Sequence, residues 1–285
     1  MIPWSLVNRN RNALALLGIV ALLLLAGCGG TSQASPGQTP GITTAVATLT
    51  AQPNGTTNLT WDPATKTLTA KIALVGLAPN STHPTAIMEG SCAHEGAVAH
   101  QLTPIKADKY GNVTTTETVK GVAGGIPGTG WNLNIQNGPA AASAAQTASI
   151  VCADISNPNA APAVKQTVQV KVNGAPSATG PAPSGIATLK LQNGTLTVHL
   201  TMRGLAPNSK HAAHIHSGTC SRQGPVVHAL TEVTADASGN ATETTTIKNI
   251  SSIPSSGWYV NVHSGTDVTN QTGYAPLACG NVSAK

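Results

Sequence analysis

The chain has 285 residues, contains no Phe, and carries only 9% charged residues with a formal net charge of +5. Without residues 1–27, which hold Arg9 and Arg11 and no acid, 13 basic and 10 acidic residues remain, a charge of 13 − 10 = +3. This charge is too small to indicate nucleic-acid binding. The abundance of Thr, Ala, Gly, Asn and Val favours short strands with many turns over helices.

The N-terminus has the pattern of an export signal. Arg9 and Arg11 precede an uncharged apolar run at 13–26, which is shorter than the roughly 20 residues that span a bilayer. The run ends in LAGC at Cys28, which resembles the bacterial lipobox, where the Cys is acylated and becomes the first mature residue. The alternatives are an ordinary signal peptide with an incidental Cys, or an uncleaved anchor. We expect residues 1–27 to be a lipoprotein signal peptide, and a lipid on Cys28 to attach an extracytoplasmic protein to the membrane.

Two linkers and an internal repeat divide the rest of the chain. Residues 28–42 form a Gly-, Ser-, Pro- and Thr-rich tether, and residues 173–185 form a second such linker. The segment GLAPNSTHPTAIMEGSCAHEGAVAHQL, from Gly76, aligns without gaps to GLAPNSKHAAHIHSGTCSRQGPVVHAL, from Gly204. A repeat of this length is a domain. The expected domains are residues 43–172 and 186–285.

The local patterns of both copies predict strands. Residues 186–191 and 195–202 alternate between apolar and polar residues, and QNG between them predicts a hairpin. The stretches DKYGN at 108–112 and DASGN at 236–240 predict turns. Such spacing without amphipathic helices predicts an all-β fold of two tandem antiparallel β-sandwich or Greek-key barrel domains.

The repeat also orders the cysteines. Once Cys28 is assigned to the lipid, four cysteines remain, and four allow three pairings. Each copy has one Cys after its first long strand region and one near its end. Disulfides Cys92–Cys152 and Cys220–Cys279 are therefore the economical pairings, and an oxidising compartment would preserve them.

Histidines concentrate in the second copy. His214 and His216 are two residues apart and share one face of a strand. Residues 259–263 alternate too, with Val260 and Val262 on the expected core face and His263 on the other. If these strands are neighbours, three imidazoles converge outside the core. Imidazoles suit copper, zinc or iron, so the spacing does not choose the metal. The alternative is a surface strand that is merely rich in His.

The order of these motifs carries a family resemblance. From His214 onward the chain resembles copper,zinc superoxide dismutase and the CHRD domain. The shared signals are His214-Ile215-His216, Cys220, Gly224-Pro225, EVTADASGNA at 232–241, Val262-His263 and Leu277-Ala278-Cys279-Gly280. The resemblance implies a copper site of His214, His216 and His263, the disulfide Cys220–Cys279, and an outer-shell role for Asp267. As an alternative, Asp267 is a solvated loop acid.

The chain also departs from the dismutases. Val226 stands where they carry a further His, and His228, two residues on, could keep the same strand face and is a candidate fourth ligand. No His lies between His228 and His263, so the zinc loop is absent and zinc is not expected. Pro276 replaces the Arg that attracts superoxide in the dismutases, which puts fast catalysis in doubt. Arg222 is a candidate substitute.

The first copy lacks the ligand pattern. Ala86, Met88 and Gln136 occupy the positions of the three histidines, so we expect a structural partner domain. Three other histidines remain there, and the persistence of His100 without metal partners favours a structural role for His228. His83 matches His211 and His100 matches His228, whereas His94 stands where the second copy has Arg222.

Two functions follow from the resemblance. One is a copper enzyme that dismutates superoxide without a zinc site. The other is a non-catalytic CHRD-type surface domain for copper sequestration or adhesion. The sequence leaves the choice between enzyme and binding protein open, and it shows no nucleophile elbow, phosphate loop or Cys-x-x-Cys motif for other chemistries.

Overall fold

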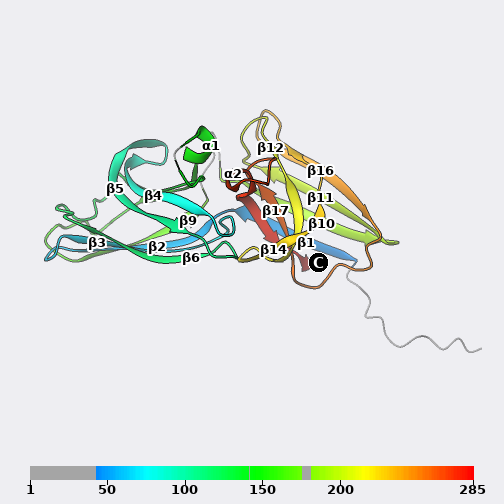
Figure 1. Ribbon diagram of the computed structural model, residues 1–285, viewed down its shortest axis with the longest axis horizontal. Coiled ribbons are helices and arrows are strands. Elements are labelled where there is room, and N and C mark those ends of the chain that lie inside the picture. The colour runs from blue at the N-terminus through cyan, green and yellow to red at the C-terminus, as the bar shows by residue number, and fades with distance from the viewer. Residues whose placement is uncertain (1–42, 141, 175–180) are drawn as a thin grey trace, which may run out of the picture. The chain divides into compact units, whose positions relative to one another are not determined.

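The computed structural model describes residues 43–140, 142–174 and 181–285 and has an all-β fold (Figure 1). Its strands form antiparallel sheets, so the predicted fold class is confirmed. The expected signal peptide, Cys28, the tether and part of the second linker lie outside the described residues. Among the residues described, no helix is both long and apolar enough to cross a membrane.

The N-terminal half, β2 to β9, has two four-stranded sheets with the orders β6-β3-β2-β9 and β5-β4-β7-β8. Alternation builds its core, as in β3, where Leu68, Ala70 and Ile72 are buried and the residues between them face outward. The first sheet holds β2 (Asn54–Asp62), β3 (Thr67–Val75), β6 (Val113–Lys120) and β9 (Gln166–Asn173). The second holds β4 (Thr82–Ser91), β5 (His94–Lys106), β7 (Trp131–Gln136) and β8 (Ser149–Ile155).

The C-terminal half contains one larger sheet, with the order β14-β13-β17-β18-β1-β10-β11-β16. Its strands are β1 (Thr44–Ala51), β10 (Ser184–Gln192), β11 (Thr195–Arg203), β13 (Ala213–Thr219), β14 (Arg222–Ala229), β16 (Ala241–Lys248), β17 (Trp258–His263) and β18 (Pro276–Asn281). The short β19 (Ser283–Ala284) pairs with β1, and β12 (Lys210–His211) pairs with β15 (Val233–Thr234). One-turn helices, α1 (Ala144–Thr147) and α2 (Gln271–Tyr274), precede β8 and β18.

Strand β1 belongs to the C-terminal half, although the sequence grouped residues 43–172 as one domain. β1 pairs with β10 from Thr44↔Lys190 to Thr50↔Ser184, and with β18 at Ala51↔Ala278. Its buried side chains, Ala45, Ala47 and Leu49, lie in the C-terminal core. Alternation predicts a strand here, but it does not show which sheet receives that strand.

The strand orders of the two halves correspond. β6-β3-β2-β9 and β5-β4-β7-β8 match β16-β11-β10-β1 and β14-β13-β17-β18. In this correspondence β9 takes the place beside β2 that β1 takes beside β10. The difference is that β1 also pairs with β18 and joins the two layers into one sheet.

Local chemistry accounts for the turns. The predicted hairpin between β10 and β11 is confirmed. Asn193 and Gly194 have φ values of 50° and 72°, the left-handed backbone conformation that a tight two-residue hairpin turn requires. In the 236–240 turn, Asp236 Oδ1 accepts from the backbone N–H groups of Ser238 and Asn240 at 2.8 and 2.9 Å. Asp108 makes the same pair of bonds at the 108–112 turn.

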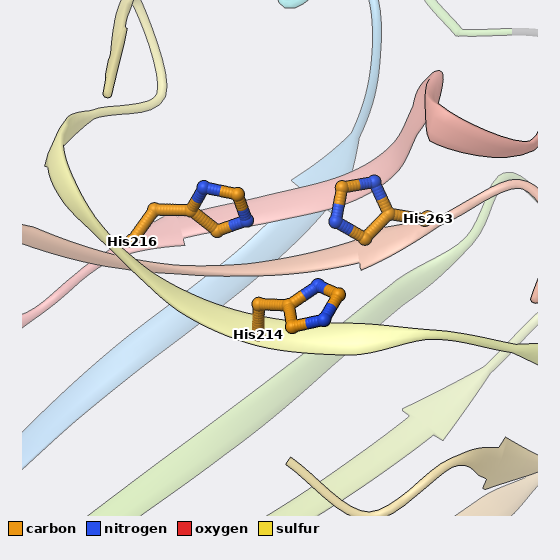
Figure 2. A group of neighbouring side chains, drawn as sticks. All are labelled: His214, His216 and His263. Atoms are coloured by element: carbon orange, nitrogen blue, oxygen red, sulfur yellow. The ribbon is translucent and has the colours of Figure 1, made fainter. Parts of the chain in front are cut away.

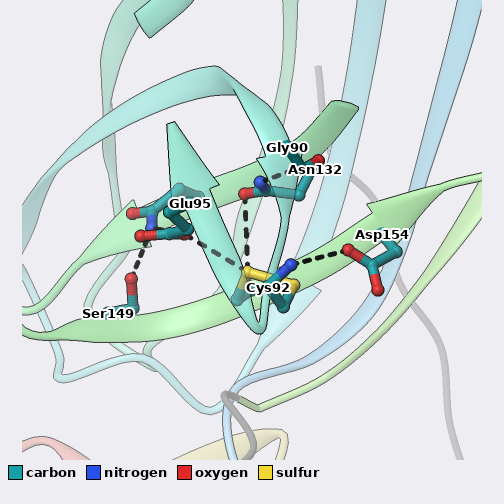
Figure 3. The surroundings of a disulfide bond; sticks show 8 residues. Gly90, Cys92, Glu95, Asn132, Ser149 and Asp154 are labelled. Atoms are coloured by element: carbon teal, nitrogen blue, oxygen red, sulfur yellow. Dashed lines mark hydrogen bonds between the residues drawn. A yellow bond between two sulfur atoms is a disulfide. The ribbon is translucent and has the colours of Figure 1, made fainter. Parts of the chain in front are cut away.

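One disulfide closes each half, between Cys92 and Cys152 and between Cys220 and Cys279, the pairings favoured by the sequence. The Cys92 backbone N–H donates to Asp154 Oδ1 at 2.8 Å (Figure 3). The Cys220 N–H donates to Asn281 Oδ1 at 2.9 Å. Two disulfides indicate an oxidising, extracytoplasmic environment.

Candidate metal centre

Two neighbouring strands bring three histidines together. β13 carries His214 and His216, and it pairs antiparallel with β17, which ends at His263. The register places the three imidazoles on one face of the sheet. Their ring centroids are 5.0 to 5.6 Å apart, and one nitrogen from each lies within 4.8 Å of the others (Figure 2).

Backbone carbonyls determine which nitrogens are free. His216 Nδ1 lies 3.0 Å from the Gly224 carbonyl oxygen, and His263 Nδ1 lies 2.6 Å from that of Tyr274. A carbonyl oxygen only accepts, so each Nδ1 donates its proton and each Nε2 keeps a lone pair. His214 Nδ1 and His216 Nε2 are buried without a hydrogen-bond partner. The group therefore presents Nδ1 of His214 and Nε2 of His216 and His263.

The group is buried, although the alternation along the two strands predicts imidazoles that converge outside the core. They do lie on the face opposite Val260 and Val262, but the segments that follow β13 and β17 cover that face and supply Gly224 and Tyr274. Of the three clustered histidines, only His214 is partly exposed. The fully buried side chains on this face are His216, Tyr259, Asn261 and His263.

Burial also sets the charge of the imidazoles. It lowers the pKa of His214 and His216, and it lowers the pKa of His263 to about 4. Repulsion between the neighbouring imidazoles adds to the shift of His263. All three rings are therefore neutral at neutral pH, which is the form that binds a metal.

Aromatic and amide side chains surround the three rings. The Tyr259 ring stacks on His216 with centroids 5.0 Å apart and an interplanar angle of 20°. The Tyr274 ring lies 5.0 Å from His263 at 54°. The Tyr259 hydroxyl and Asn261 Oδ1 are buried without a partner. Buried polar atoms without partners beside three clustered imidazoles fit a metal site.

The CHRD domain family matches residues 162–269. This stretch contains all three histidines of the group, so the predicted CHRD resemblance is confirmed for it. Among solved structures, the chain is similar to the crystal structure of a SOD-like protein from Bacillus subtilis, at 17% identity and a TM-score of 0.28. That similarity covers 34% of this chain and 88% of the other. No curated protein matches the chain.

His228 does not join the three-histidine group of the CHRD-matched segment. It pairs with Ile215, whose side chain faces the core, and it packs edge-on against Trp258 at 5.4 Å. The cause is a register shift between Ile215 and His216: one step on β13 corresponds to two on β14, so Val226, not His228, lies opposite His216. A bulge of this kind reverses the face of the residues beyond it.

The other residues singled out in the sequence also lie apart from the three donor nitrogens. Asp267 is exposed, and its carboxylate accepts from Thr269 and Asn270 of its own loop. Arg222 is exposed and lies over the Tyr110 ring at 4.3 Å. Pro276 pairs with His263 in the β17–β18 register and is buried. No Asp, Glu or Cys of the described residues joins the histidine group.

Sequence reasoning missed the groups that hold the ligands in place. His211 is buried, and its Nδ1 donates to the His263 carbonyl oxygen at 2.9 Å, while its Nε2 lies 2.7 Å from Ser209 Oγ. The spacing of His211 before His214, and the matching His83, were the available signals. The carbonyls of Gly224 and Tyr274 have no sequence signal, because any residue supplies a carbonyl.

The N-terminal half has the same strand pairing at the corresponding positions but lacks the three histidines. Ala86 and Met88 pair with Asn134 and Asn132, as His214 and His216 pair with Asn261 and Tyr259. His83 Nδ1 donates to the Gln136 carbonyl oxygen at 2.8 Å, as His211 does to that of His263. His100 packs edge-on against Trp131 at 4.9 Å, and His94 is exposed.

Proposed function

We propose that the C-terminal half binds one copper ion through His214 Nδ1, His216 Nε2 and His263 Nε2. The observation that carries this proposal is the set of three neutral imidazole nitrogens within 4.8 Å of one another, two of them buried without a hydrogen-bond partner. Imidazole binds copper, zinc and iron, and the affinity order of divalent metals places copper highest. Bound copper would supply one-electron redox chemistry.

Hydrogen bonds within the protein would orient the donor imidazoles before the metal binds. The carbonyls of Gly224 and Tyr274 fix two imidazoles in the tautomer that leaves Nε2 free, and His211 holds the backbone of His263. Such outer contacts raise metal affinity by orienting the ligands. The partly exposed edge of His214 would be the side from which a small solute reaches the metal.

Superoxide dismutation is the second candidate. Three protein donors leave a coordination position free, as an open catalytic site requires. Against rapid turnover, Pro276 stands beside His263 where the dismutases carry an attracting Arg, and Arg222 is engaged with Tyr110. The result would be a copper-binding surface protein with slow dismutation or none.

We also propose that the chain is a lipoprotein built from two copies of one domain. The Cys28 motif and the extracytoplasmic disulfides support the anchor. The matching strand orders support the duplication, and the CHRD match begins ahead of β9, the counterpart of β1. In this interpretation the two copies have exchanged their first strands, so that β1 completes the second copy and β9 the first.

The test measures bound copper and superoxide turnover together in residues 29–285 with both disulfides formed. We expect one copper per chain, and His216→Ala and His263→Ala should each weaken binding by more than about a hundredfold, beyond the loss typical of an outer contact. His228→Ala is the control and should bind normally. Copper that persists in both ligand variants would overturn the site.

A further inference from the structure

We propose that this site favours univalent copper, binding Cu(I) in preference to Cu(II) and to Zn(II). This inference rests on the proposed function and specifies the oxidation state that the site selects. It follows from the charge, the surroundings and the number of the donors.

The donors and the groups behind them carry no negative charge. Each donor is a neutral imidazole nitrogen, and the atoms that fix His216 and His263 are the carbonyl oxygens of Gly224 and Tyr274. Asp267, the nearest acid to His263 in the sequence after the ligand, is exposed and bonded within its own loop. A bound ion would therefore keep its full charge, without carboxylate compensation from the described residues.

The surroundings make that uncompensated charge costly. His216 and His263 are fully buried, and the rings of Tyr259 and Tyr274 pack against them. The chain has only three Tyr, and two of them lie here. The cost of moving an ion from water into a weakly polar interior rises with the square of its charge, so it is larger for a divalent ion. Cu(I) therefore loses less on entering this site than Cu(II) or Zn(II).

The number of donor nitrogens, three, also favours Cu(I) over Cu(II) and Zn(II). Cu(I) accepts three donors, whereas zinc sites are typically four-coordinate and Cu(II) prefers tetragonal sites. The residue opposite His216 on β14 is Val226, and the register shift turns His228 to the other face. Without this register shift, regular alternation from Val226 would place the His228 imidazole on the same face as the three donors. With it, the site has no fourth imidazole from β14.

Asn261 offers a direct way to test the charge argument. Its side chain is buried beside the ligands, with Nδ2 3.5 Å from both ring nitrogens of His263 and Oδ1 unpartnered. Asn261→Asp adds a carboxylate there with almost no change in shape. The control is Asn281→Asp, which adds the same charge at the exposed last residue of β18, where the N-terminal half already has Asp154 in the equivalent hydrogen bond.

The experiment measures Cu(I) affinity under anaerobic conditions by chelator competition, Cu(II) and Zn(II) affinity by titration, and the reduction potential of the copper-loaded protein. In the unmodified protein, Cu(I) should bind more tightly than Cu(II) by more than about a hundredfold. Asn261→Asp should reduce this ratio about tenfold, which lowers the potential by about 59 mV, and Asn281→Asp should leave it unchanged.

The outcomes separate this inference from the proposed function. Failure to bind copper in either oxidation state overturns both. Copper that binds at the three histidines with Cu(II) as tight as Cu(I), or with zinc tighter than Cu(I), overturns the preference alone. If Asn261→Asp does not fold, the affinity ratio in the unmodified protein still decides the matter, since it requires no variant.

Discussion

The two halves share several stabilising contacts and differ at the three positions that form the histidine group in the C-terminal half. Both have a disulfide that closes about sixty residues, a buried His donating to a β-strand carbonyl, and a half-buried His packed edge-on against a Trp. At the three ligand positions one half has histidines, and the other has Ala86, Met88 and Gln136. The shared features therefore stabilise each half in its own right, because they persist where no such histidine group exists among the described residues. The three histidines found at these positions in one half only are the candidates for metal binding.

Removing the disulfides, one half at a time, should have the largest effect on stability. Cys92 and Cys152 are 60 residues apart, and Cys220 and Cys279 are 59 apart. In the chain-entropy model each bond contributes about 4 kcal/mol to the free energy of unfolding. We expect Cys220→Ala/Cys279→Ala to weaken copper binding as well, because β14, which begins two residues after Cys220, supplies the Gly224 carbonyl that orients His216.

The matched variant, Cys92→Ala/Cys152→Ala, should lose similar stability and still bind copper. Urea unfolding and copper titration of the two double variants measure both effects. Equal loss of copper in the two variants would show that the N-terminal disulfide also serves the metal site, and the separation of roles between the halves would be wrong.

A smaller effect tests whether β1 serves the C-terminal half. Leu49 is buried in the C-terminal core, although it lies ahead of the whole N-terminal half in sequence. Leu49→Ala should cost about 2–5 kcal/mol, as for other buried leucines, and should reduce copper binding under mild denaturation. Its counterpart is Val172 in β9, buried in the N-terminal core. Val172→Ala should destabilise the N-terminal half and leave copper binding intact, and the reverse result would contradict the strand assignment.

Acid should destabilise the metal-free protein, and His263 accounts for a defined part of the loss. Its pKa is lowered to about 4 in the folded state by burial, against 6.5 for an ordinary His. Between pH 6.5 and 4 the unfolded chain binds this proton and the folded chain does not. The free energy of unfolding therefore decreases as the pH is lowered through that window. The contribution is about 3 kcal/mol. Urea unfolding at pH 7 and pH 4.5 should show a smaller loss for His263→Gln, which copies Gln136, and an identical loss would contradict this origin.

The sequence predicted the all-β class, the hairpin at residues 192–194 and the pairing of the cysteines, because these depend on local patterns and on the repeat. It also selected His214, His216 and His263, since alternation assigns a face within a strand. It could not predict what covers that face, because Gly224 and Tyr274 act through backbone carbonyls. Nor could alternation identify the sheet that receives β1, since long-range pairing leaves no local signal.

The smallest predicted effect concerns the His–Trp pair that each half contains, His228 with Trp258 and His100 with Trp131. Regular alternation from Val226 would have placed it with the ligands, and the bulge beside His216 turns it against Trp258 instead. His100 lies against Trp131 beside the same kind of register shift, in a half without the three ligands. We expect His228→Ala and His100→Ala each to cost about 1 kcal/mol, the scale of an edge-on aromatic pair, and neither to change copper affinity. Thermal unfolding measures the first effect and chelator competition the second. A loss of copper in His228→Ala alone would make His228 a ligand that moves on metal binding, and the similarity between the two His–Trp pairs would then be coincidental.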